Sequence, residues 1–182
     1  MAILKVARLG HPVLRMKASP VDPDKIRTPA VQRFIDDMID TMHEYDGAGL
    51  AANQVHTPAQ IAVIEVTSNP RYPEAPSIPL TVVINPVVTP LTKEMEDDWE
   101  GCLSVPDMRG RVPRYTEVRL QCLDREGQTI DVVAKEFFAR VIQHETDHLD
   151  GVLFLDRMKS FESLAFLEEF SRYWSRRDIK EE

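Results

Sequence analysis

The sequence of 182 residues has little cysteine, no long apolar run and no excess of positive charge. Its two cysteines, Cys102 and Cys122, are too few for a disulfide framework, and in a reducing compartment such residues more often bind metal or pack in a core. No run of eighteen apolar residues is present, which argues against a membrane-spanning helix. The formal net charge of -8 argues against broad electrostatic binding to nucleic acid or anionic membranes.

The first residues also lack the features of a targeting segment. They contain neither the long apolar stretch and cleavage site of a signal peptide nor the Arg- and Ser-rich composition of a transit peptide. We therefore expect a cytoplasmic protein. The length suits one domain, to which we assign residues 1–182, because neither internal repeats nor a domain linker is visible.

Local patterns predict helices near both ends of the chain and strands between them. Thr28 and Pro29 are typical of a helix start, and apolar residues then recur with helical period as far as a stop at Gly47. A last helix is predicted to begin at Ser160, with its apolar residues on one face. Prolines predict an extended arm at 1–30, a loop or flap at 69–79, and an edge or bulge at Pro86. Strands are predicted at 61–66, 80–85, 87–91, 116–123 and 129–134, with a hairpin turn at 124–127.

An H-E-x-x-H sequence, His144 to His148, lies in a helix predicted from Lys135 to Gly151. Residues four apart share a helix face, so the two imidazoles can bind one metal ion. Glu145 can then exchange a proton with a water molecule without being a ligand. A buried helix with two incidental histidines stays open from this stretch alone, because so short a pattern also occurs by chance.

Two further stretches contain residues suited to chemistry. Residues 47–54 read G-A-G-L-A-A-N-Q, which lacks the lysine of a phosphate loop; a structural turn is favoured, although Gln54 could donate a hydrogen bond into a cleft. Residues 100–104 read E-G-C-L-S, in which Cys102 is poorly placed for a regular core and, given the H-E-x-x-H sequence, is interpreted as a metal ligand. Cys122 lies on the apolar side of an alternating strand and is interpreted as a core residue.

Together, the sequences at 47–54, 100–104 and 143–148 closely resemble the motifs of the peptide deformylase family, and the likeness extends over nearly the whole chain. The proline-rich insert at 69–79 looks like the mitochondrial-type branch. The resemblance implies an α+β fold with mixed and antiparallel sheets around a central metal-binding helix, and with N-terminal and C-terminal helices. It also implies a hydrolase that removes the N-formyl group from newly made polypeptides beginning with formyl-methionine, with release of formate.

The resemblance implies a metal centre made by Cys102, His144 and His148. It implies one Fe²⁺ ion per chain, for which Zn²⁺, Ni²⁺ or Co²⁺ can substitute. By ligand preference alone, one thiolate and two imidazoles suit zinc. Three protein ligands leave a fourth position for water, which is typical of catalytic rather than structural sites.

Catalytic and substrate-binding roles follow from the same resemblance. Glu145 is assigned to proton transfer, and the Gln54 side-chain amide and the Leu103 backbone N–H to stabilisation of the developing oxyanion. The residues expected to bind substrate are Gly47, Gly49, Leu50, Glu100, Arg109, Val141 and His144.

Two residues depart from the family pattern near the expected methionine pocket. Ala48 stands where a larger aliphatic residue is common, and Arg140 occupies a position that is often apolar. The expected partners are N-formyl-methionyl nascent peptides, with a transient contact to the ribosome. The last helix carries charges of both signs, so no strongly basic tail for such a contact is evident.

Two other functions remain as alternatives. A zinc metallopeptidase would share the H-E-x-x-H sequence and take its third ligand from Glu168 or Glu169, but it would leave Cys102 and Gln54 unexplained. A non-enzymatic, metal-stabilised binding module would need a fourth ligand, and no spare Cys or His is suitably placed by sequence.

Overall fold

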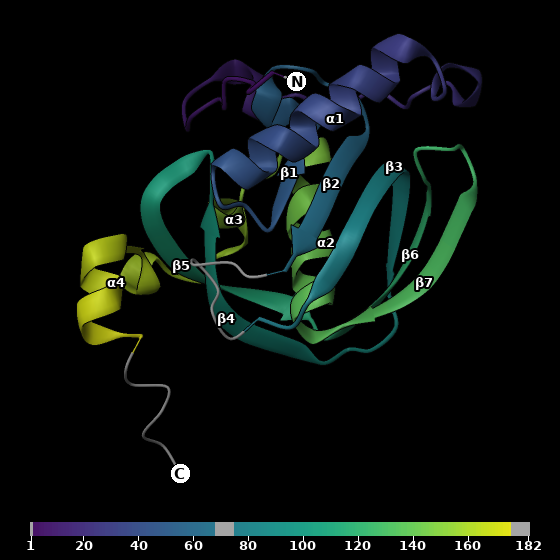
Figure 1. The fold of residues 1–182 in the computed structure, drawn as a ribbon. Coiled ribbons are helices and arrows are strands. Elements are labelled where there is room, and N and C mark those ends of the chain that lie inside the picture. The colour runs from purple at the N-terminus through teal and green to yellow at the C-terminus, as the bar shows by residue number, and fades with distance from the viewer. Residues whose placement is uncertain (1, 68–74, 176–182) are drawn as a thin grey trace.

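Two antiparallel β-sheets lie around a central helix in the computed structural model, which describes residues 2–67 and 75–175 (Figure 1). One sheet has five strands in the order β1-β2-β3-β6-β7, and the other has three in the order β4-β5-β8. Within the described residues, the one parallel pairing is an isolated bridge between Ser19 and Ala59. The predicted α+β fold is confirmed. In the part of the chain that is described, no helix is long and apolar enough to cross a membrane.

Four strands of the five-stranded sheet form where strands were predicted, whereas the first forms within residues 47–54, for which a structural turn was favoured. The sheet contains β1 (Gly49–Ala51), β2 (Ile61–Val66), β3 (Ile78–Pro90), β6 (Glu117–Leu123) and β7 (Thr129–Lys135). The two strands expected around Pro86 form one strand, β3, whose register against β6 shifts between Ile84 and Val87. That irregularity accommodates the proline, which cannot donate a ladder hydrogen bond, so the predicted bulge is confirmed.

The central strand β2 explains how the two main helices are placed. Its residues are buried on both faces, as expected for the nearly continuous apolar run I-A-V-I-E-V. Val63 packs under α1 (Pro29–Glu44), whereas Ile64 packs against α2 (Glu136–Leu149) on the opposite face (Figure 1). The sheet therefore holds α2, the helix of the H-E-x-x-H sequence, inside the molecule.

The start of α1 agrees with the sequence except in its capping. Thr28 occupies the N-cap position and Pro29 begins the helix, but the Thr28 hydroxyl donates to the Lys25 carbonyl at 2.7 Å and makes no cap hydrogen bond. The arm before it contains two short 3₁₀ turns, Pro12–Arg15 and Pro23–Lys25. Near the end of α1, the exposed ring of His43 pairs with Glu65 on the neighbouring strand β2.

The three-stranded sheet was not predicted from sequence. Strands β4 (Met95–Cys102) and β5 (Val105–Tyr115) form a long hairpin, and β8 (Ala165–Phe166) pairs with β5. Charged residues, two prolines and two glycines interrupt any alternation of apolar and polar residues in this hairpin. The hairpin matters because it carries the E-G-C-L-S sequence to the edge of the site.

The prediction that the last helix begins at Ser160 is wrong. The Ser160 hydroxyl accepts from Glu162 N at 3.1 Å and caps only a 3₁₀ turn, Phe161–Ser163. The chain then becomes extended, because the backbone of β8 pairs with Met108 and Arg109 of β5. Helix α4 covers only Leu167–Tyr173. The short helix α3 (Phe154–Arg157) lies between α2 and the turn that begins after Ser160. Most of the proline-rich insert at 69–79 lies outside the described residues.

Candidate active site

Cys102, His144 and His148 come together at the end of strand β4 and on the inward face of helix α2. Their potential ligand atoms all lie within 4.8 Å of one another. The Cys102 sulfur is 3.2 Å from Nε2 of His148, and the two imidazole rings are 5.0 Å apart, in an edge-to-face arrangement. Cys102 is 3 % exposed and His148 is 1 % exposed, so two of the three donors are almost fully withdrawn from solvent.

This donor set fits a divalent transition metal. Burial alone would raise the pKa of the Cys102 thiol, but the charge on His148 and hydrogen bonds to both imidazoles hold that pKa well below its usual range. A thiolate beside two imidazoles is a ligand set for iron or zinc. Glu168 and Glu169, the donors of the metallopeptidase alternative, instead form ion pairs with Arg172 on exposed α4. Among the described residues they do not join the donor group, which counts against that alternative.

Glu100 holds the first histidine in place. One Glu100 oxygen lies 2.9 Å from Nδ1 of His144, which directs the opposite ring nitrogen, Nε2, away from this carboxylate. The Glu100 carboxylate also accepts hydrogen bonds from Arg114 at 2.8 and 3.0 Å and from Arg140 at 2.9 Å. Burial would raise the pKa of Glu100, but Arg114 and His144 lower it far below its usual range, so the group is a fixed anion. Such carboxylate–histidine pairs orient metal ligands.

Arg114 extends this network along α2 to Asp147. It donates to Asp147 at 2.5 Å, and Asp147 also accepts from Arg157 at 2.7 Å. The buried charges are therefore paired and hydrogen-bonded, as stability requires. Sequence reasoning gave Arg114 and Asp147 no role. The available signals were the V-P-R sequence at 112–114 and the acidic residue inside the H-E-x-x-H sequence.

Glu145 lies buried beside the donors and has one unused oxygen. It is 4 % exposed, and its Oε2 has no hydrogen-bond partner among the described residues. Burial raises the pKa of Glu145 to about 6, which is suited to proton transfer near neutral pH. Gly49 makes room for this side chain: a Cβ atom there would lie 2.4 Å from Oε1 of Glu145.

The predicted oxyanion donors lie next to Cys102. The Gln54 amide nitrogen is 3.1 Å from the Ser104 hydroxyl and 3.5 Å from the Cys102 sulfur. The side-chain oxygen of Gln54, Oε1, accepts a hydrogen bond from Ala51 N at 2.9 Å, which fixes the side-chain amide with its nitrogen toward the site. Leu103 follows Cys102 directly, in the turn between β4 and β5.

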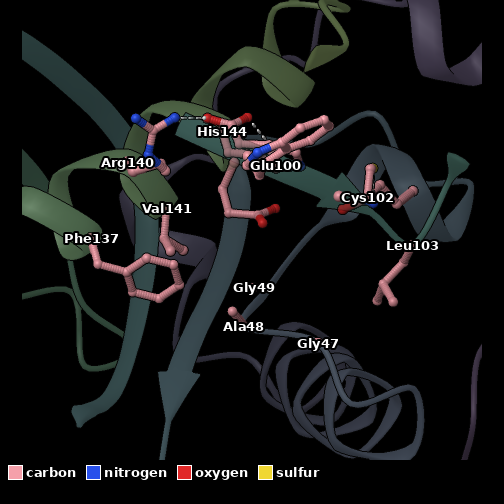
Figure 2. A pocket seen from close by; sticks show the side chains of 14 residues that line it. Gly47, Ala48, Gly49, Glu100, Cys102, Leu103, Phe137, Arg140, Val141 and His144 are labelled. Atoms are coloured by element: carbon pink, nitrogen blue, oxygen red, sulfur yellow. Dashed lines mark hydrogen bonds and ion pairs between the residues drawn. The ribbon is translucent and has the colours of Figure 1, made fainter. Parts of the chain in front are cut away.

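A cavity of about 40 Å³ opens beside these groups (Figure 2). Phe137, Arg140 and Val141 of α2 lie along one wall, and Ala48 with its two glycine neighbours lies across from them. The Arg140 guanidinium donates hydrogen bonds to Glu100 and to the backbone carbonyls of Val112 and Glu96, and these bonds fix the side chain in the cavity wall. The complete lining is Gly47, Ala48, Gly49, Gln54, Trp99, Glu100, Gly101, Cys102, Leu103, Phe137, Arg140, Val141, His144 and Glu145.

Two of the residues expected to bind substrate do not line this cavity. Leu50 is fully buried in the core under α1. Arg109 is 4 % exposed and lies against Gly101, where a Cβ atom would come within 2.7 Å of its guanidinium. Arg109 therefore packs against Gly101, a residue of the cavity lining, and does not line the cavity itself. Gly47, Gly49, Glu100, Val141 and His144 do line the cavity.

A thiolate and two imidazoles with a carboxylate beside them, at a cavity with an apolar wall, define a metal-dependent hydrolase. Residues 3–163 match the polypeptide deformylase family, and the chain belongs to that family. Enzymes of this family remove the N-formyl group from the N-terminal methionine of nascent peptides.

Individual relatives and solved structures agree with this assignment. The chain is 47 % identical to peptide deformylase 1 of Nitrosomonas europaea, over 91 % of this chain and 93 % of the relative. It is 46 % identical to peptide deformylase 2 of Ralstonia nicotianae, with the same coverage. The Met-Ala-Ser-bound class I type b peptide deformylase of Acinetobacter baumannii superposes with a TM-score of 0.83 at 38 % identity, covering 86 % of this chain and 99 % of that chain.

Proposed function

We propose that Cys102, His144 and His148 hold one Fe²⁺ ion and that this centre deformylates nascent peptides beginning with N-formyl-methionine. The observation that carries the proposal is the grouping of a buried thiolate, two imidazoles and a carboxylate with a free oxygen at one cavity. The donor set also accepts Zn²⁺, Ni²⁺ or Co²⁺, since thiolate and imidazole bind all of them. The reaction is expected to take place in the cytoplasm, with a transient contact to the ribosome.

A metal ion held by these donors supplies Lewis-acid chemistry, which makes a water molecule acidic enough to lose its proton near neutral pH. We assign the acceptance of that proton to Oε2 of Glu145, which has no other partner among the described residues. The water oxygen forms a bond to the formyl carbon, and as the C–N bond breaks Glu145 delivers the proton to the nitrogen of the leaving amine, so that formate and a free N-terminus are the products.

The oxygen of the formyl group gains negative charge during the reaction and needs fixed donors. The Gln54 amide nitrogen and the Leu103 backbone N–H are our candidates, because Gln54 is held by its bond to Ala51 and Leu103 borders the cavity. Each donor of this kind contributes on the order of 3 kcal/mol to transition-state stabilisation. The methionine side chain would enter the cavity of about 40 Å³, called the inner cavity below, against Phe137 and Val141.

The test is release of formate from a formyl-Met tripeptide by anaerobically purified protein, with metal content measured on the same sample. We expect turnover that is lost on chelation and regained with Fe²⁺. Glu145→Ala should retain the metal and lose at least about 100-fold in kcat, since it removes the general base but no ligand. Glu44→Ala, which removes an exposed carboxylate at the end of α1, is the matched control. A metal-loaded protein that releases no formate would refute the proposal.

A further inference from the structure

A second, larger cavity adjoins the metal donors. It measures about 810 Å³ and shares Cys102 and Leu103 with the inner cavity. In Figure 2, Phe137 and Leu103 lie at opposite ends of the inner cavity, so the outer cavity extends from the end away from the apolar wall. Its lining is Lys5, Val6, Ala7, Arg8, His11, Tyr45, His56, Cys102, Leu103, Pro106, Asp107 and Leu167.

The N-terminal arm forms one wall of the outer cavity and is fastened to the candidate active site. Ala7 N donates to the backbone carbonyl of Gln54 at 2.7 Å, and Leu9 N donates to the backbone carbonyl of Ser104 at 2.7 Å. Lys5 and Arg8 lie on this fixed stretch of backbone, and both side chains are exposed. Their charges are therefore held beside the site by main-chain bonds that a side-chain substitution does not remove.

This wall carries two positive charges, those of Lys5 and Arg8. No ion pair or side-chain hydrogen bond joins Lys5 or Arg8 to another residue in the described ranges 2–67 and 75–175. The rings of His11 and His56 lie 4.7 Å apart in the same lining, and Asp107 is its one acidic residue. In a chain with a net charge of -8, this is a local concentration of unpaired positive charge at a cavity.

The order of groups in a formyl-Met peptide indicates which of its residues the outer cavity would receive. The inner cavity, at about 40 Å³, is far smaller than the outer cavity, at about 810 Å³. With the formyl group at the donors and the methionine side chain toward Phe137, the following residues must leave by another route. The outer cavity begins at Cys102 and Leu103 and provides that route.

We propose that the outer cavity receives the residues that follow formyl-methionine and that Lys5 and Arg8 select acidic side chains among them. This inference rests on the proposed deformylase function and adds a substrate preference to it. The two cations are exposed, so each charge pair should change KM by only about 1.5- to 5-fold, and salt should weaken the effect. The chemical step occurs elsewhere, so kcat should be unaffected.

The experiment compares three amidated peptides: formyl-Met-Asp-Glu, its neutral isostere formyl-Met-Asn-Gln, and formyl-Met-Lys-Lys. With the metal-loaded protein at low salt, we expect KM to be about three- to tenfold lower for the acidic peptide than for its isostere. KM should be higher still for the basic peptide, and the three values should converge at about 0.5 M salt.

Variants then locate the preference. Lys5→Ala with Arg8→Ala should abolish it, Lys5→Glu with Arg8→Glu should invert it, and Lys5→Arg with Arg8→Lys should preserve it. Lys25→Ala with Arg33→Ala removes the same charges from exposed positions outside the cavity and should leave the preference intact. Formate release from all three peptides with equal KM, or a preference that survives Lys5→Glu with Arg8→Glu, would overturn this inference alone. Absence of formate from every peptide would overturn the deformylase proposal and this inference with it.

Discussion

Replacing Gly49 by alanine tests whether the position of Glu145 controls turnover. A Cβ atom at residue 49 would lie 2.4 Å from Oε1, 2.7 Å from Cδ and 2.8 Å from Cγ of Glu145. Ordinary contact begins near 3.4 Å, so the carboxylate must move by about 1 Å. A displacement of that size in a reacting group can lower the rate by about 100-fold. We expect Gly49→Ala to lower kcat by about that factor and to retain the metal.

The same contact predicts a coupling in stability. Overpacking of this kind costs about 1–3 kcal/mol in the free energy of unfolding. In a Glu145→Ala background the clashing atoms are gone, so Gly49→Ala should cost close to nothing there. The assay is urea unfolding of the wild type, both single variants and the double variant, with formate release measured in parallel. Equal destabilisation by Gly49→Ala in both backgrounds would show that the contact with Glu145 is not the cause.

Three further predictions concern the cysteines, a charged cap and the acyl group. Cys102→Ser should lower metal content, because a hydroxyl does not ionise near neutral pH, whereas Cys122→Ser should cost about 1 kcal/mol in stability and leave metal content unchanged; the reverse result would refute the assigned ligand. Burial would raise the pKa of Asp156, but hydrogen bonds from Arg15 and from Leu153 N lower it. The stability from this depressed pKa is present at neutral pH and lost as pH falls through the folded-state value, so Asp156→Asn should cost about 0.5 kcal/mol at pH 7 and nothing near pH 2 in urea unfolding. Acetyl-Met peptides should react at least about 100-fold more slowly than formyl-Met peptides, because the added methyl disturbs attack geometry at the donors, and comparable initial rates would point instead to a general aminoacylase.

The metal donors could be predicted from sequence because their signals are local. The spacing of His144 and His148 gives a shared helix face without knowledge of the fold. The sequence distinguishes the roles of Cys102 and Cys122 by their neighbours. Cys102 follows a glycine in an irregular stretch, whereas Cys122 lies in a strand whose apolar and polar residues alternate. In the structure, Cys102 lies in the candidate donor group, and burial raises the pKa of Cys122 to about 11.

The hairpin and the charge network could not be predicted because their causes are not local. Strands β4 and β5 are stabilised by pairing with each other and by β8, and their own sequence has weak strand propensity. Arg114 contacts Glu100 and Asp147, which lie 14 and 33 residues away in sequence. The start of α4 moved to Leu167 for a similar reason, because pairing with β5 outweighed the local capping signal at Ser160.

The distribution of the donors along the chain has a consequence for how the centre is assembled during folding. His144 and His148 come together as soon as one turn of α2 forms, which is a fast and local event. Cys102 lies 46 residues before His148, on a strand that reaches the helix only when the hairpin docks. Closure of so long a segment is a late step in a fold dominated by non-local strand pairing. At the metal centre that we propose, an ion bound before the hairpin docks would have only the two imidazoles as ligands, and the thiolate would complete the donor set when folding is nearly complete.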